Sequence, residues 1–316
     1  MMNSIRRNIF LVLLFSCSRL VAQDEDSFLS DLPDADSALT FQDSLNIFSL
    51  IDSLLQLEDV SGSQLALRVG YNSNVQSAGR TLGIDNFGLA PGISYYHSSG
   101  LYADVTGFWS KDFVPSYYLT VASVGYLHTF SKKFSAMAGY DHYFYTEQDD
   151  DSYIPYQNTV SITPILELHP VTISVNYAYY FGDAHVHRIA PGINLTFQKR
   201  NWKGIDRIAF SPAFFALFGN DIITEVRYPE TVRELIRRVR QGLPWYEITE
   251  RNEFGIMNYT LSAPISVSYK NWNLTLTYNY NIPKALPGET LTYSESSFLS
   301  GSLSYFIALR QHKSGL

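Results

Sequence analysis

The sequence predicts an all-β fold, a transmembrane antiparallel up-and-down β-barrel of about 12 strands, from two observations. Apolar and polar residues alternate at period two in successive segments between residues 63 and 310. The gaps between these segments are alternately short and long. Alternation gives each strand one face for hydrocarbon and one for water, and the two gap lengths correspond to the turns and loops at opposite ends of such a barrel.

The clearest strand covers residues 171–181, whereas facing is mixed in 117–130 and 134–146. The apolar face of the 171–181 strand carries Val171, Ile173, Val175, Tyr177, Tyr179 and Phe181. We expect the short gaps to be periplasmic turns: 97–100, 131–133, 169–170, 199–204 and 270–271. We expect the long gaps to face the cell exterior: 74–85, 111–116, 147–156, 183–188, 221–253 and 282–295. An even number of strands places both termini at the periplasmic end.

Composition agrees with this fold. Aromatic residues make up 15% of the 316 residues, and charged residues only 17%, below the ~25% typical of soluble domains. After its first residues the chain has no apolar run long enough for a membrane helix, which excludes a helical membrane protein. The net charge of −7 gives no reason to expect nucleic acid as a partner.

The start of the chain predicts export. Arg6 and Arg7 precede an apolar run over residues 9–15, and small or polar residues follow, so residues 1–23 are interpreted as a secretory signal peptide cleaved after Ala22 or Gln23. The single cysteine, Cys17, lies in this segment. A competing interpretation makes residues 14–17 a lipoprotein cleavage box with Cys17 as the lipidated residue.

Residues 24–62 are expected to form a periplasmic leader, and residues 63–316 the barrel. Leader residues 41–57 carry apolar side chains three and four positions apart, which predicts an amphipathic helix. This helix would plug the lumen, lie under the barrel or simply tether the leader to the first strand.

Four small-Pro elements interrupt the strand pattern. Residues 90–93 and 190–193 are both Ala-Pro-Gly-Ile, and Pro164 and Pro264 lie in similar contexts. Proline removes a ladder donor and a closed barrel has no free edge, so bulges or local bends are expected there. Hairpin duplication would explain the similarity, and so would a common way of bending a barrel wall.

The positions expected to face inward combine charged, small polar and aromatic side chains. The candidate lumen or constriction residues are Arg68, Tyr102, Asp104, Asp141, Glu167 and Arg310. Twelve strands enclose more room than eight and less than sixteen, so a narrow solute path is possible. Tyrosines on a polar wall suit small polar solutes, although they would also serve to fill space.

The longest gap, 221–253, contains a predicted helix. Residues 231–234 match a capping box, and Gly242 and Pro244 provide a stop. Its polar face carries Arg233, Arg237, Arg238 and Arg240. If the helix folds into the barrel mouth, these arginines would constrict the pore and favour anions. If it faces outward, they would bind lipopolysaccharide phosphates. The third alternative is a solvent-exposed helix face that binds no ligand.

Catalytic and metal-binding signals are sparse, so no enzyme activity, cofactor or metal is predicted. The sequence has no GxSxG, HExxH, P-loop or CxxC motif. Asp183, His185 and His187 form only a weak metal-ligand pattern. His128 and His142 lie near opposite ends of adjacent predicted strands, which separates them as catalytic partners.

Aromatic residues lie near the predicted strand ends: Trp109, Phe134, Phe181, Phe197, Trp202, Tyr269 and Trp272. Together with the signal peptide, the amphipathic strands and the turn and loop alternation, they resemble the bacterial outer-membrane β-barrel (porin-like) superfamily over residues 63–316. The Val-Ala-Gln signal ending resembles those of Bacteroidota exports. The resemblance implies an outer-membrane location, contact with membrane lipid and lipopolysaccharide, and insertion by the barrel-assembly machinery. The expected function is a narrow channel for small polar or anionic solutes. The alternative is a non-conducting structural or interaction barrel that displays its loops or docks a periplasmic partner.

Overall fold

The structure, a computed structural model, describes residues 62–73, 88–111, 115–146, 156–229, 231–244, 246–289 and 293–309. The chain divides into two units, Met1–Asp34 and Ala35–Leu316, and every described residue belongs to the second. The predicted signal peptide, the leader helix and Arg310 lie outside the described residues.

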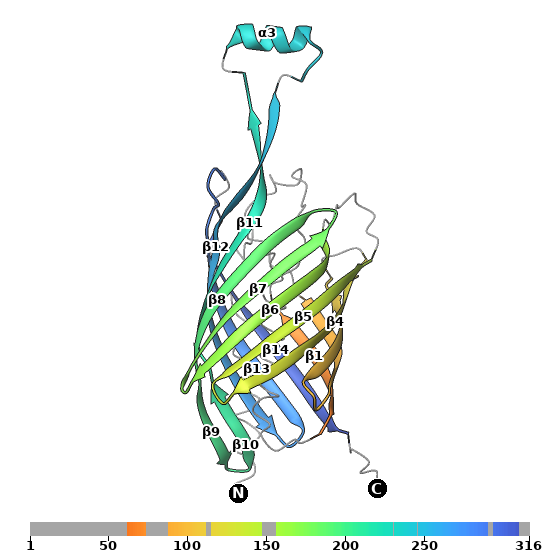
Figure 1. The fold of residues 1–316 in the computed structure, drawn as a ribbon, viewed down its shortest axis with the longest axis vertical. Coiled ribbons are helices and arrows are strands. Elements are labelled where there is room, and N and C mark those ends of the chain that lie inside the picture. Colours follow the sequence, from red (N-terminus) through yellow and green to blue (C-terminus); the bar gives the residue numbers. More distant parts are fainter. Residues whose placement is uncertain are drawn as a thin grey trace, which may run out of the picture. The chain divides into compact units, whose positions relative to one another are not determined.

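The described residues form fourteen strands and one helix, shown in Figure 1. The elements are β1 (Gln64–Asn72), β2 (Gly88–Tyr96), β3 (Leu101–Trp109), β4 (Tyr117–Ser131), β5 (Phe134–Tyr145), β6 (Tyr156–Leu168), β7 (Val171–Gly182), β8 (His185–Leu195), β9 (Phe197–Trp202), β10 (Ile205–Phe210), β11 (Ala213–Arg227), α3 (Val232–Arg240), β12 (Glu247–Tyr269), β13 (Trp272–Pro283) and β14 (Ser296–Ala308).

These strands close into an antiparallel barrel. Strands β1 to β8 pair in sequence order, as do β9 with β10 and β11 to β14. β1 also pairs with β14, β11 with β8, and β10 with β12. β9 continues β8 past Thr196, and β10 leads into β11 past Pro212, so the fourteen segments make a closed barrel of twelve strands. The predicted fold class is therefore confirmed.

The two faces of each strand differ as the sequence predicts. Outward side chains such as Val69, Ile162 and Leu276 are 51%, 50% and 58% exposed, whereas their neighbours on the opposite face are half-buried or buried. An exterior this apolar is stable only against hydrocarbon, because in water it would be a continuous hydrophobic patch. The wall is that of an outer-membrane barrel.

Exposed aromatic side chains mark the end of the barrel where the chain turns tightly. Phe197, Tyr269 and Trp272 are 54%, 48% and 47% exposed there. Lys199 and Lys203 place their Nζ atoms 5.7 Å and 5.1 Å from the Trp202 ring. Aromatic rings with neighbouring lysines are typical of the membrane–water interface.

Several predicted connections have the wrong length. The turn expected over 199–204 is only Lys203 and Gly204, because β9 and β10 form a hairpin beyond it. The loop expected over 183–188 is a tight connection of Asp183 and Ala184, because β8 begins at His185. The strands bordering the 221–253 gap extend through it to Arg227 and from Glu247, where alternation is too weak to reveal them.

The four prolines interrupt the ladder on one side without shifting its register. Pro91 pairs with Val69 of β1. Toward β3, the ladder is interrupted between the pairs Leu89↔Trp109 and Gly92↔Thr106. Pro164, Pro191 and Pro264 show the same pattern, continuous toward one neighbour and open toward the other. Of the expected bulges or local bends, bulges are therefore absent at these described prolines, because the missing donor affects only one ladder.

Bulges occur elsewhere and turn consecutive residues inward. β4 has Tyr118 as an extra residue between the pairs Phe108↔Leu119 and Trp109↔Tyr117, and Tyr118 and Leu119 are both buried. β12 has Met257 as an extra residue opposite the Leu217/Phe218 step. The first bulge explains the mixed facing of residues 117–130.

The predicted loop helix is present as α3, at the tip of the β11–β12 hairpin (Figure 1). Thr231 is its N-cap, and the Glu234 backbone N–H donates to Thr231 Oγ1 at 3.3 Å. No described helix is long and apolar enough to cross a membrane.

Candidate functional site

The inner wall of the barrel is the candidate functional site. On β12, β13 and β14 its side chains are mostly asparagine, serine and threonine, and many bond to one another. Asn258 Nδ2 donates to Asn281 Oδ1 at 3.1 Å, and Ser262 Oγ donates to Asn279 Oδ1 at 2.9 Å. This sector presents uncharged donors and acceptors.

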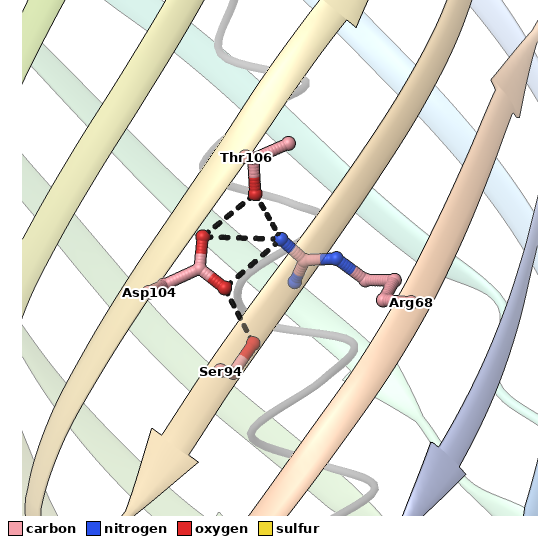
Figure 2. A network of polar contacts seen from close by, with 4 residues as sticks. All are labelled: Arg68, Ser94, Asp104 and Thr106. Carbon is pink, nitrogen blue, oxygen red and sulfur yellow. Dashed lines mark hydrogen bonds and ion pairs between the residues drawn. The ribbon is translucent and has the colours of Figure 1, made fainter.

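The opposite character is found on β1, β2 and β3, where an ion pair forms the centre of a polar network (Figure 2). Arg68 Nη2 donates to Asp104 Oδ1 at 3.2 Å and Oδ2 at 3.1 Å, and to Thr106 Oγ1 at 2.5 Å. Thr106 Oγ1 in turn donates to Asp104 Oδ1 at 2.7 Å, and the Ser94 hydroxyl donates to Oδ2. The Arg68 and Asp104 side chains are only 10% and 8% exposed.

A glycine allows Arg68 to reach its partners. Arg68 on β1 is paired with Gly92 on β2, and Gly92 is paired with Thr106 on β3. The guanidinium crosses β2 to reach Asp104 and Thr106 (Figure 2). A Cβ at Gly92 would lie 2.7 Å from Thr106 Oγ1 and 3.1 Å from Arg68 Nη2. The first Ala-Pro-Gly-Ile element thus supplies the space for the ion pair.

The repeated element supplies similar space across the barrel. A Cβ at Gly192, the matching glycine on β8, would lie 2.3 Å from Cδ1 of the Phe215 ring on β11. In both elements the residue after proline faces inward and accommodates a side chain from a neighbouring strand. The sequence repeat marks this role, which neither hairpin duplication nor bending of the wall had predicted.

Tyr102 lies against the wall. It is paired with Gly125 on β4, which is paired with Gly139 on β5. A Cβ at Gly125 would lie 2.4 Å from the Tyr102 hydroxyl oxygen, and one at Gly139 would lie 2.9 Å from it. The Tyr102 ring therefore lies over two glycines and occupies the space that their side chains would otherwise fill.

Asp141 continues the polar row started by Asp104. The register places Asp104 opposite Ser123 and Ser123 opposite Asp141, and the Ser123 hydroxyl is hydrogen-bonded to Asp141. The structure therefore brings Arg68, Tyr102, Asp104 and Asp141 into one sector of β1–β5. Sequence reasoning missed Ser94, Thr106 and Ser123, because short hydroxyl side chains are common at inward positions and carry no individual signal.

The remaining predicted residues lie elsewhere. Glu167 is exposed near the β6–β7 turn, on the inward side of its strand. The arginines of α3 lie beyond the strands that form the ring, and none of the helix residues is buried.

The histidines lie away from this sector. His128 faces outward beside Tyr126 and Phe130, and His142 Nδ1 lies 2.8 Å from Asn158 Oδ1 on the exterior. The rings of His185 and His187 are 6.5 Å apart, and the described residues include no group of three or more potential ligands that would hold a metal ion.

Comparisons with known proteins give structural neighbours only. No family model and no curated protein matches the chain. A solved structure described as KdgM porin is 10% identical, covers 77% of this chain and 98% of its own, and has a TM-score of 0.43. A NanC porin structure is 9% identical, covering 78% and 100%, with a TM-score of 0.39. A bacterial polysaccharide outer membrane secretin is 7% identical, covering 79% and 99%, with a TM-score of 0.37.

Proposed function

We propose that this protein is a narrow channel for small polar solutes across the bacterial outer membrane, with both termini in the periplasm. The observation that carries the proposal is the inner wall, which joins an uncharged amide and hydroxyl sector on β12–β14 to a charged sector on β1–β5. Such a wall replaces the hydrogen bonds that a polar solute loses when it leaves water.

Anion preference receives less support than general polarity. Arg68 shares its Nη2 group between Asp104 and Thr106, so its charge is balanced within the wall. Asp141 adds a further carboxylate to the same sector. We therefore favour small uncharged polar solutes over anions as cargo.

A non-conducting barrel is the second candidate, and one observation favours it. Several inner-wall side chains, including Ser94, Thr163 and Asn279, are 0% exposed. A barrel whose inner residues satisfy one another in this way is suited to displaying its outer hairpin without passing solute.

Single-channel recording separates these candidates. Refolded protein comprising residues 24–316 is inserted into a planar bilayer, and its insertion is verified by heat-modifiable migration. Discrete current steps whose size changes in Asp141→Asn support the channel. Folded, inserted protein without steps contradicts it and favours the non-conducting barrel.

A further inference from the structure

An apolar stripe on α3 is exposed. Val232, Ile236 and Val239 are 72%, 48% and 61% exposed, and Leu235, on the same face, is 36% exposed. At 100° per residue these four positions share one side of the helix. Leu243, just after the helix, adds a fifth exposed aliphatic side chain at 49%.

Three arginines flank this stripe on one side. Arg233, Arg237 and Arg240 are exposed, and helical spacing places them within about one-sixth of a turn of one another. Arg238 has a different role, because its Nε donates to the Pro244 carbonyl at 3.1 Å and its Nη2 to the Tyr246 carbonyl at 2.9 Å. The surface formed by the aliphatic stripe and Arg233, Arg237 and Arg240 is called the α3 face below.

The β11–β12 hairpin extends beyond the ring of strands and carries α3 at its tip. The ladder between β11 and β8 ends at Gly219↔Arg188, and that between β12 and β13 begins at Asn258. Beyond these pairs β11 and β12 pair only with each other, from Asn220↔Phe254 to Arg227↔Glu247 (Figure 1). Eight pairs at about 3.4 Å per residue give a two-stranded ribbon roughly 27 Å long.

We propose that the α3 face docks on the lipid surface of the membrane that holds the barrel, with its arginines on phosphorylated headgroups and its aliphatic stripe at the acyl boundary. A phosphorylated lipid surface satisfies both halves of the face, because it offers anionic and apolar groups side by side. Guanidinium groups bind phosphate in bidentate geometry. A second copy of α3 would bring like charges together, and a soluble polyanion would leave the stripe in water. In the structure the ribbon rises from the rim of the barrel with α3 at its tip (Figure 1), so the docking that we propose requires the ribbon to fold over toward the membrane surface beside the ring.

A single labelled cysteine tests this docking. The only cysteine in the sequence is Cys17, in the predicted signal peptide, so Val239→Cys in residues 24–316 provides one site for a polarity-sensitive fluorophore. The protein is placed in nanodiscs of phosphatidylcholine alone or with phosphatidylglycerol. We expect a blue shift of the label only in the discs that contain phosphatidylglycerol.

Charge variants make the test specific. Replacing Arg233, Arg237 and Arg240 with glutamine is expected to remove at least half of the blue shift. Replacing Lys132, Lys133 and Lys270 with glutamine removes the same charge from turns at the other end of the barrel and should keep the shift. Unfolding midpoints verify that both variants remain folded.

Three results would overturn the proposal. One is an unchanged label spectrum in anionic discs, and another is an equal blue shift in the variant that lacks the three arginines. The third is a shift that appears in phosphatidylcholine discs only after soluble polyphosphate is added, which would identify a polyanion as the partner. None of these results depends on whether the barrel conducts.

Discussion

The ion pair between Arg68 and Asp104 gives the sharpest test of the inner wall. Asp104 accepts hydrogen bonds from Arg68, Ser94 and Thr106, and both charged side chains are about nine-tenths buried. Asp104→Asn keeps the shape but leaves the guanidinium without its counter-charge. Removing one partner of a buried pair costs about 3–5 kcal/mol, and we expect the lower end because Thr106 still accepts from Arg68.

The assay is urea unfolding of the refolded barrel in lipid vesicles, followed by tryptophan fluorescence. Arg68→Gln is expected to cost a similar amount, because it leaves a buried carboxylate. The double variant removes both charges, so it should be more stable than the sum of the single losses predicts, by about 2 kcal/mol. Glu167→Gln is the matched control, since this carboxylate is exposed, and should change stability by less than about 0.5 kcal/mol.

The reasoning is refuted if Asp104→Asn costs no more than Glu167→Gln. It is also refuted if the two single losses simply add in the double variant. Either result would mean that the pair is not coupled in the folded barrel.

Three further predictions concern the wall and the hairpin. Gly125→Ala should destabilise the barrel by about 1–3 kcal/mol in the same assay, and Tyr102→Ala should rescue it, because the added Cβ would lie 2.4 Å from the Tyr102 hydroxyl; no rescue would contradict the contact. Leu276→Arg on the exterior should cost about 2–4 kcal/mol in vesicles, whereas Thr277→Arg on the inner wall should cost clearly less, and equal costs would argue against the assigned faces. Replacing residues 228–246 with a short Gly-Ser linker should change the thermal unfolding midpoint by only a few degrees, because the ring closes through β11 and β12 below this segment. A large drop in that midpoint would show that α3 supports the barrel.

Strand faces were predictable because period-two alternation is a local property of sequence. The strand 171–181 needed only its own side chains to be assigned, and the structure gives β7 over Val171–Gly182. The bulge at Tyr118 was not predictable, because an extra residue shows itself only when its partner strand is known. The extension of β11 and β12 beyond the ring was also not predictable. Outside the membrane both faces of a strand contact water, so the alternation of apolar and polar residues is lost.

The candidate site was predictable in its charges and not in its geometry. Arg68 and Asp104 were identified because the period-two alternation places both on the inward face of their strands. Their partnership depends on Gly92, whose role appears only when the register places it between Arg68 and Thr106. Tyr102 was expected to face the lumen, and its position across Gly125 and Gly139 likewise depends on pairs far apart in sequence.

Substituted-cysteine accessibility tests the central claim, that solutes pass along the polar inner wall, most directly. Thr277→Cys on the inner wall and Leu276→Cys on the exterior are each made in residues 24–316, which lack any other cysteine. Single-channel current is recorded before and after a charged methanethiosulfonate reagent is added. The inner-wall cysteine is expected to reduce the current step on modification, and the exterior cysteine to leave it unchanged. Current steps that are unaffected at Thr277→Cys, even though mass spectrometry shows complete modification, would contradict a solute path along this wall.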